Sequence, residues 1–218
     1  METITARKTI DRTGKTITTF VVFDASTELE TMNEGDVLEV LADDFEPFPA
    51  DISAWCRATG HRLLASDRVA TGYRFLIEKG SPKTKETSLA MVISADGLEE
   101  LLSPLGFALG AALEGINVHL YFQGPAVRVL TKGFQPRLKG WARPFTRFAA
   151  AGMTKSGHIP AQDKLHQLRG LGGHLYVCGG SLQPFKVKRE DLIFDDLPIV
   201  EYLTFMSVME RTDIHLYI

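Results

Sequence analysis

The chain has 218 residues, of which 44% are hydrophobic and 23% charged, and its formal net charge at pH 7 is −3. This composition is ordinary for a globular protein, and the charge gives no reason to expect nucleic acid as a partner. The amino terminus lacks a signal-peptide pattern, and the longest mainly apolar stretch, 101–113, is too short to span a bilayer. We therefore expect a cytoplasmic protein.

Metal and cofactor motifs are absent from the sequence. The two cysteines, Cys56 and Cys178, form neither a CxxC pair nor a disulfide framework. The six histidines do not have metal-ligand spacing, and the glycine pairs at 172–173 and 179–180 fit no nucleotide-binding motif. We therefore expect no metal and no cofactor.

Residues 1–79 predict a small two-layer α/β sandwich with its elements in the order β-α-β-α-β-β. Apolar residues recur every three or four positions from 22 to 32, as on one face of a helix. The other expected elements are a strand at 36–42, a helix from Asp51 to its cap at Gly60, and strands near 63–64 and 73–77.

A polar segment at 80–86 predicts a linker, and residues 87–218 predict a second α/β domain. Strands and helices alternate along this domain, which favours a mainly parallel sheet covered by helices. The expected strands are 88–94, 116–122, 174–178 and 214–218, and the expected helices are 104–113, 162–171 and 200–211.

Cys178 ends an apolar strand and is followed by Gly179, Gly180 and Ser181. Because sites in parallel sheets lie at the carboxyl ends of strands, we expect this thiol to be half in the core and half at the surface. The backbone amides of the three following residues would stabilise a thiolate or a bound sulfur. Two roles for the Ser181 hydroxyl stay open, donation to the sulfur and capping of a turn. A free cysteine can also be a small core residue.

Residues 178–192, which read Cys-Gly-Gly-Ser-Leu-Gln-Pro-Phe-Lys-Val-Lys-Arg-Glu-Asp-Leu, resemble the cysteine segment of the DsrE-like family. The resemblance covers about 87–218 and implies a three-layer α/β domain, a homo-oligomer and a persulfide on Cys178. The sequence departs from the family pattern at Gly179, Gly180 and Leu182, which affects the turn geometry and the choice of partner.

The first 80 residues are similar to the TusA (SirA-like) sulfur-carrier family, through 11–14, 35–44 and 51–61. That family has Cys-Pro at the start of its first helix, where this chain reads Lys15-Thr16-Ile17-Thr18-Thr19-Phe20. We expect these threonines to cap the helix and Cys56 to be a core residue. The resemblance then implies a domain that docks a partner carrier and holds no sulfur itself.

Residues 132–155 combine aromatic and basic side chains and contain no acidic residue. Pro136, Gly140 and Pro144 argue against one continuous helix. One interpretation is an inserted hairpin that packs on a neighbouring subunit, and the other is contact with a membrane surface or an acidic partner. The residues expected to make this contact are Phe134, Trp141, Arg143, Phe145 and Arg147.

Two functions follow from these patterns. The first is a sulfur-relay protein that receives sulfane sulfur on Cys178 from a donor protein and passes it to an acceptor protein. The alternative is a non-catalytic scaffold or regulator of a sulfur-transfer complex, which the missing carrier cysteine of the first domain favours.

Overall fold

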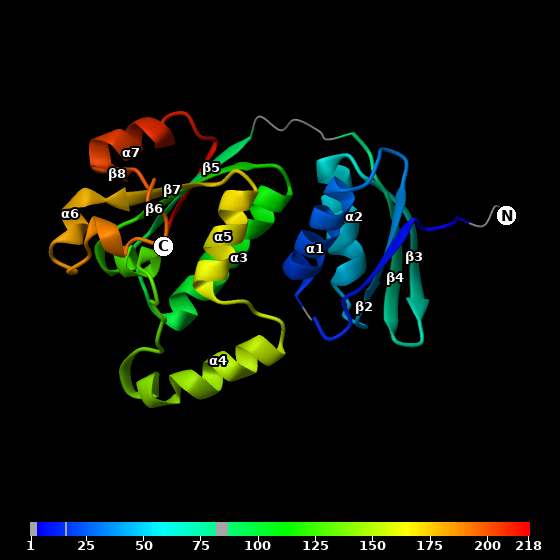
Figure 1. Ribbon diagram of the computed structural model, residues 1–218, viewed down its shortest axis with the longest axis horizontal. Helices are drawn as coiled ribbons and strands as arrows, with labels where there is room; N and C mark the ends of the chain where they lie inside the picture. The colour runs from blue at the N-terminus through cyan, green and yellow to red at the C-terminus, as the bar shows by residue number, and fades with distance from the viewer. Residues whose placement is uncertain (1–3, 16, 82–86) are drawn as a thin grey trace. The chain divides into compact units, whose positions relative to one another are not determined.

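The computed structural model describes residues 4–15, 17–81 and 87–218, and Figure 1 shows their elements. The chain divides into two compact units, one built mainly from residues 4–81 and the other mainly from 87–218. Each unit is described separately below. Thr16 and residues 82–86 of the predicted linker lie outside the described residues.

The amino-terminal unit is a four-stranded sheet with two helices on one face, in the predicted order β-α-β-α-β-β (Figure 1). The strand order is β1-β2-β4-β3, with β1 parallel to β2 and the other pairs antiparallel. Its elements are β1 (Lys8–Asp11), α1 (Thr18–Glu30), β2 (Val37–Ala42), α2 (Phe48–Thr59), β3 (Arg62–Val69) and β4 (Gly72–Glu78).

Helix α2 begins three residues before the predicted start at Asp51. Pro49 lies in its first turn, where a missing backbone N–H costs no hydrogen bond, so the proline starts the helix instead of preceding it. Gly60 ends the helix as predicted, with φ at 88° and its N–H donating to the Cys56 carbonyl at 3.0 Å.

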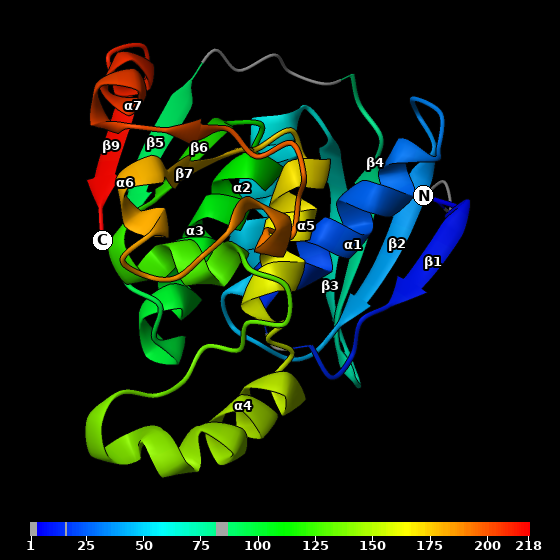
Figure 2. The ribbon, with the colours of Figure 1, turned by 60° about the vertical axis from the view of Figure 1, so that its left-hand side comes forward.

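The carboxy-terminal unit is built on a five-stranded, fully parallel sheet in the order β8-β7-β6-β5-β9. Figures 1 and 2 show α3 and α5 on one face of this sheet and α7 on the other, which gives the predicted three layers. The elements that form these layers are β5 (Ser88–Ile93), α3 (Leu98–Leu113), β6 (Asn117–Phe122), α5 (Ala161–Gly170), β7 (His174–Cys178), β8 (Ile199–Val200), α7 (Tyr202–Met209) and β9 (Ile214–Tyr217).

Side-chain alternation along β6 and β7 decides which residues face α7. Tyr121 and Tyr176 are register partners, and successive residues of a strand point to opposite faces. Tyr176 and Cys178 are two residues apart on β7, so Tyr121, Tyr176 and Cys178 share one face. Leu120, Leu175 and Val177 point to the face that carries α3 and α5.

Two predicted helices differ in extent from the observed ones. Helix α3 begins six residues before Pro104 and contains that proline, whose cost of about 3 kcal/mol is offset by the burial of Leu101, Leu105 and Leu109. The helix predicted from Val200 is shortened at its start, because Ile199 and Val200 pair with Val177 and Cys178 as strand β8. The paired residues are more than twenty positions apart in the sequence, so local periodicity does not reveal that they pair.

The basic aromatic segment folds as a 3₁₀-helix, η2 (Gly140–Phe145), followed by α4 (Thr146–Lys155), and not as a hairpin. Gly140 has φ at 58° and Pro144 lies inside η2, which explains why no single helix forms. None of the helices in the described ranges has both the length and the apolar character needed to cross a membrane.

Candidate functional site

Cys178 is the last residue of β7 and the N-cap of the short helix α6 (Gly179–Leu182). Its position at the carboxyl end of a parallel strand is the predicted one. The side chain is only 1% exposed, however, so the expectation of a half-exposed thiol is wrong. The sequence patterns did not reveal the cover, which consists of α7 and the residue that precedes it.

A buried tyrosine lies next to the Cys178 thiol. Tyr121 is 1% exposed, and its hydroxyl forms no regular hydrogen bond with any described residue. Burial raises the pKa of Tyr121, and the neighbouring Cys178 thiol raises it further. Buried hydroxyl groups nearly always have a partner, and the group that the Tyr121 hydroxyl faces is the Cys178 thiol.

A second tyrosine lies between the thiol and solvent. The negative charge that Cys178 can carry is the main cause that raises the pKa of Tyr202, ahead of the smaller effect of burial. The Tyr202 side chain itself is 59% exposed. Cys178 therefore has a largely exposed tyrosine beside it, and its surroundings are polar as well as apolar.

Glu201 packs its carboxylate against the glycines that follow Cys178. A Cβ atom placed on Gly179 would lie 2.6 Å from Glu201 Oε1, whereas one on Gly180 would lie 3.5 Å from Oε2. Only glycine leaves room at position 179 for the carboxylate in its present place. The stabilisation of sulfur by the amides of Gly179 and Gly180 stays a prediction.

Ser181 joins two loops of the sheet. Its side chain is buried, and Oγ accepts a hydrogen bond of 2.8 Å from the Gly124 N–H in the segment after β6. The contact holds the turn after β7 against the turn after β6. This loop contact is neither of the two roles that the sequence left open, so donation from Ser181 to the sulfur and capping of a turn both stay predictions.

Aromatic rings attach α7 to the sheet above Cys178. Phe205 is 2% exposed and stacks on Tyr121 with 4.6 Å between ring centroids, and it meets Tyr176 edge-on at 5.4 Å. Tyr202 meets Tyr121 edge-on at 6.2 Å. Sequence reasoning missed Tyr121, Glu201 and Tyr202. Alternation on the strands gave a weak signal for Tyr121 alone, because the other two lay inside a predicted helix.

In the amino-terminal unit, Cys56 is confirmed as a core residue. It is 1% exposed, and burial raises the pKa of its thiol to about 12. The expected threonine cap of α1 is wrong for the described residues, because Ile17 is the N-cap and makes no side-chain capping bond. Thr18 and Thr19 lie inside the helix, and Thr18 is buried.

Comparison with known proteins places each unit in a family. Residues 21–79 match the family described as sulfurtransferase TusA, and residues 88–215 match the DsrE/DsrF-like family. The chain belongs to the DsrE/DsrF-like family. It joins a TusA domain to a DsrE/DsrF-like domain, as the sequence predicted, and both families indicate a sulfur-relay role with partner proteins.

Among solved structures, the chain is similar to the YchN protein from E. coli. The two are 12% identical, with a TM-score of 0.43, and the match covers 61% of this chain and 99% of the other.

The basic aromatic segment of the DsrE/DsrF-like domain is divided between surface and interior. Trp141, Phe145 and Phe148 are 87%, 56% and 84% exposed, which is unusual for three large rings so close in sequence. Phe134 instead packs against the buried core. Within the described ranges, no group of three or more His, Cys, Asp or Glu residues is arranged to hold a metal ion.

Proposed function

We propose that this protein is a sulfur-relay protein that carries sulfane sulfur as a persulfide on Cys178. The observation that carries the proposal is the buried Tyr121 hydroxyl, which has no regular partner in the described chain and lies next to the thiol. Such a hydroxyl can donate to a thiolate or to the outer sulfur of a persulfide without giving up another hydrogen bond.

The transfer consists of two exchange steps that balance without an added oxidant. The Cys178 thiolate attacks the outer sulfur of a donor persulfide, a new S–S bond forms, and the donor leaves as a thiolate. An acceptor thiolate then attacks the outer sulfur on Cys178 in the same way and restores the Cys178 thiolate. Sulfur donor and acceptor proteins are therefore the partners of this site.

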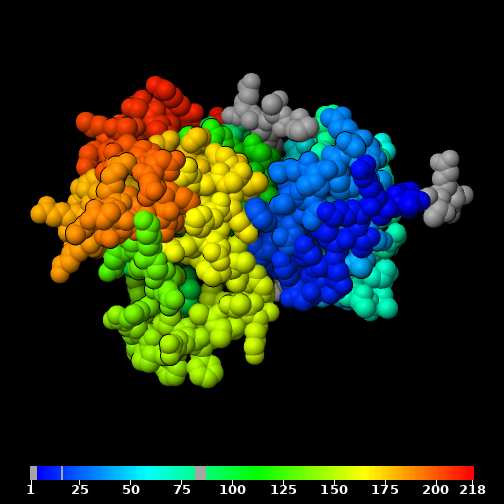
Figure 3. Space-filling view, viewed as in Figure 1, coloured from blue at the N-terminus to red at the C-terminus, as the bar shows by residue number. Residues whose placement is uncertain are grey.

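Transfer requires that the cover over Cys178 opens. Tyr202 is largely exposed although it lies beside the buried thiol, so rotation of one side chain begins to uncover the sulfur. The space-filling view in Figure 3 shows the red segment that includes α7 at the surface, where a partner reaches it. Glu201 lies at the start of this cover, as the N-cap of α7.

The TusA domain, in this proposal, docks a partner carrier and transfers no sulfur itself. Its first helix begins at Thr18 after Ile17, without the family's cysteine, and its single thiol is buried with a pKa of about 12. A thiol that is protonated and covered cannot exchange sulfur at neutral pH. The TusA domain can therefore take part only through its surface, by binding a partner carrier.

The exposed apolar side chains of the carboxy-terminal unit form surfaces for partner proteins and for the homo-oligomer that the family resemblance implies. Tyr202, Leu203 and Met206 of α7 are 59%, 84% and 50% exposed, and Tyr217 of β9 is 71% exposed. We assign this surface to the sulfur donor and acceptor proteins, because they must reach Tyr202. The exposed Trp141 and Phe145 are assigned to a neighbouring subunit, with a membrane surface as the alternative, and the protein to the cytoplasm.

Mass spectrometry tests the carrier role. After incubation with a persulfide donor, a peptide containing Cys178 should gain about 32 Da for each sulfur atom added, and Cys178→Ser should abolish the gain. Cys56→Ser is the matched control and should leave the gain unchanged. Sulfuration of Cys56, or of neither thiol, would contradict the proposal.

The alternative function is a scaffold or regulator that performs no sulfur chemistry. The 1% exposure of Cys178 favours it, as does the absence of the carrier cysteine from the TusA domain. The same experiment separates the two functions. A protein that binds a sulfur-transfer partner but never acquires sulfur on Cys178 is a scaffold.

A further inference from the structure

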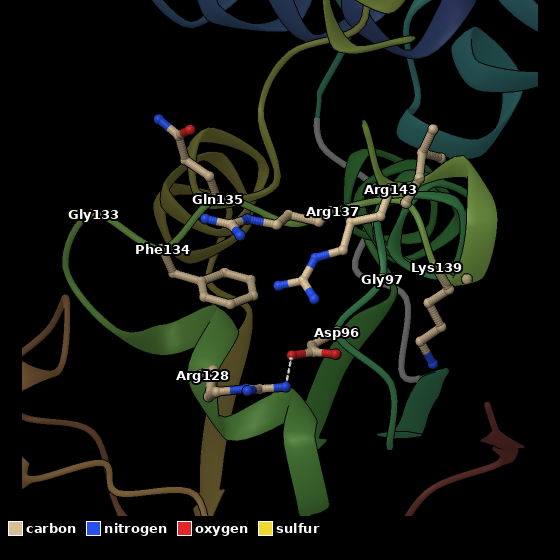
Figure 4. A pocket seen from close by; sticks show the side chains of 11 residues that line it. Asp96, Gly97, Arg128, Gly133, Phe134, Gln135, Arg137, Lys139 and Arg143 are labelled. Carbon is tan, nitrogen blue, oxygen red and sulfur yellow. Dashed lines mark ion pairs between the residues drawn. The ribbon is translucent and has the colours of Figure 1, made fainter. Parts of the chain in front are cut away.

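A cavity of about 700 Å³ lies at the carboxyl end of β5 in the DsrE/DsrF-like domain. Its walls come from the loop after β5, from the 3₁₀-helix η1 (Gly124–Leu130) and from residues 133–143 of the basic aromatic segment. All three segments belong to the same compact unit. The residues shown in Figure 4 are Asp96, Gly97, Arg128, Gly133, Phe134, Gln135, Arg137, Leu138, Lys139, Gly140 and Arg143.

The location is one where parallel sheets commonly bind ligands. The strand order reverses between β5 and β9, and the cavity lies next to this reversal, at the loops that follow β5 and β6. Ligands of open α/β sheets bind outside the carboxyl ends of the strands at such a reversal. The cavity volume also falls in the range of small-molecule sites.

The cavity has a surplus of positive charge. Four cationic side chains and one acid line it, and Asp96 forms an ion pair with Arg128. Lys139 pairs with Glu100 at 2.6 Å. Arg137 and Arg143 form no ion pair with any residue in the described parts of the chain. Two guanidinium groups therefore remain for a ligand.

The backbone that carries these two arginines is fixed to the sheet and to itself. The Arg137 carbonyl accepts a hydrogen bond of 3.0 Å from Leu98 N–H, and Arg137 bridges to Gly97 in the loop after β5. The Thr146 hydroxyl accepts a hydrogen bond of 3.1 Å from Leu138 N–H. The same hydroxyl donates a hydrogen bond of 2.7 Å to the Arg143 carbonyl. These contacts hold both arginines on the same wall before any ligand binds.

Figure 4 shows how the side chains are directed. The guanidinium groups of Arg137 and Arg143 reach towards the space beside the Phe134 ring, whereas Gln135 points away from it. Arg128 lies across the cavity with its ion pair to Asp96. The arrangement offers two forked donors beside one flat apolar surface.

We propose that this cavity binds a small anion that carries a tetrahedral oxyanion group, which Arg137 and Arg143 hold. Planar guanidinium groups match the oxygen atoms of phosphate and related oxyanions and bind them through paired hydrogen bonds. The cavity is much larger than one such group, and the Phe134 ring is an apolar wall for an organic portion. The proposal does not depend on the chemistry of Cys178.

Isothermal titration calorimetry of the full chain tests this with three probes, which are inorganic phosphate, thiosulfate and ADP. At least one probe should bind with a Kd below about 1 mM. The double variant Arg137→Gln/Arg143→Gln should bind the same probe about tenfold more weakly or worse. Arg147→Gln is the matched control, because Arg147 is a neighbouring arginine outside the lining, and it should leave the Kd unchanged.

The three probes also identify the source of the oxyanion. Tighter binding of ADP than of the inorganic ions assigns the site to an organic phosphate, and equal or tighter binding of the inorganic ions assigns it to a free oxyanion. The proposal is overturned if none of the three binds up to about 10 mM. It is also overturned if the double variant, folded by circular dichroism, binds as tightly as the parent.

Discussion

The ring of Phe205 stacks on the ring of Tyr121, with 4.6 Å between centroids and 13° between ring planes. This contact joins α7 to the strand beside Cys178, on the face of the sheet where the thiol lies. It explains how eight residues of helix keep the sulfur buried. Tyr121 is also the residue beside the thiol, so the cover and the proposed sulfur site share one residue.

Loosening this cover should expose Cys178. Tyr202→Ala removes the exposed ring beside the thiol, and we expect Cys178 in the folded protein to be alkylated by iodoacetamide about tenfold faster or more. Phe205→Ala should accelerate the reaction further, at a cost of about 3–5 kcal/mol in the free energy of unfolding. Peptide mass spectrometry over a time course measures the rate at each cysteine.

Cys56 and Leu203 supply the controls for this experiment. Cys56 is equally buried in the other domain and should stay unmodified in every variant until the protein is unfolded in urea. Leu203 is 84% exposed on the same helix, so Leu203→Ala should not change the rate at Cys178. Equal rates in Tyr202→Ala and the parent would show that Tyr202 does not limit access.

The glycines after Cys178 should respond differently to an added methyl group. In Gly179→Ala the new Cβ would lie 2.6 Å from Glu201 Oε1, so the carboxylate must move, whereas in Gly180→Ala the nearest atom is at 3.5 Å. Because Glu201 has a flexible side chain, we expect Gly179→Ala to lower the free energy of unfolding by only about 1 kcal/mol. It should nevertheless speed the alkylation of Cys178.

Gly180→Ala is the control and should resemble the parent protein in both measurements. Urea unfolding and the alkylation rate are recorded on the same samples. A loss of several kcal/mol in Gly179→Ala would mean that the carboxylate cannot move, and an unchanged alkylation rate would mean that Glu201 does not take part in the cover.

His119 should make the protein less stable in mild acid. Burial, followed by the nearby His174, lowers the pKa of His119 from 6.5 to about 4, and its ring stacks on His174 at 4.7 Å. The unfolded chain therefore takes up this proton at a higher pH than the folded chain does. Stability is full above about pH 6.5 and falls as the pH drops towards about 4.

For this half-buried ring, we expect a loss of about 1–2 kcal/mol after allowance for solvent screening. Urea unfolding at pH 7 and at pH 4.5 measures it. His119→Phe should reduce the difference between the two pH values, whereas His166→Phe, outside the stack, should not. An identical difference in the parent and in His119→Phe would contradict the assignment.

Local patterns in the sequence located most of the strands and the strand that ends at the cysteine, but not β1 or β8. Alternation and short apolar runs predicted both sheets, and the glycines after Cys178 predicted the end of β7. They failed at α3, which begins six residues before the proline that predicts its start, and at β8, whose two residues form a strand only because β7 lies beside them. Both errors arise because tertiary contacts override local preference.

The amino-acid sequence by itself determined that two sulfur-relay family domains are joined in one chain, and that the thiol of the second stands at the end of a strand. The motifs that identify the families span only a few neighbouring residues each, so they can be recognised without knowledge of the fold. Only the tertiary structure decided that Cys178 is covered by α7, that Tyr121 lies beside it and that Arg137 and Arg143 line one cavity. Those facts depend on packing between segments far apart in the chain, which no local periodicity encodes.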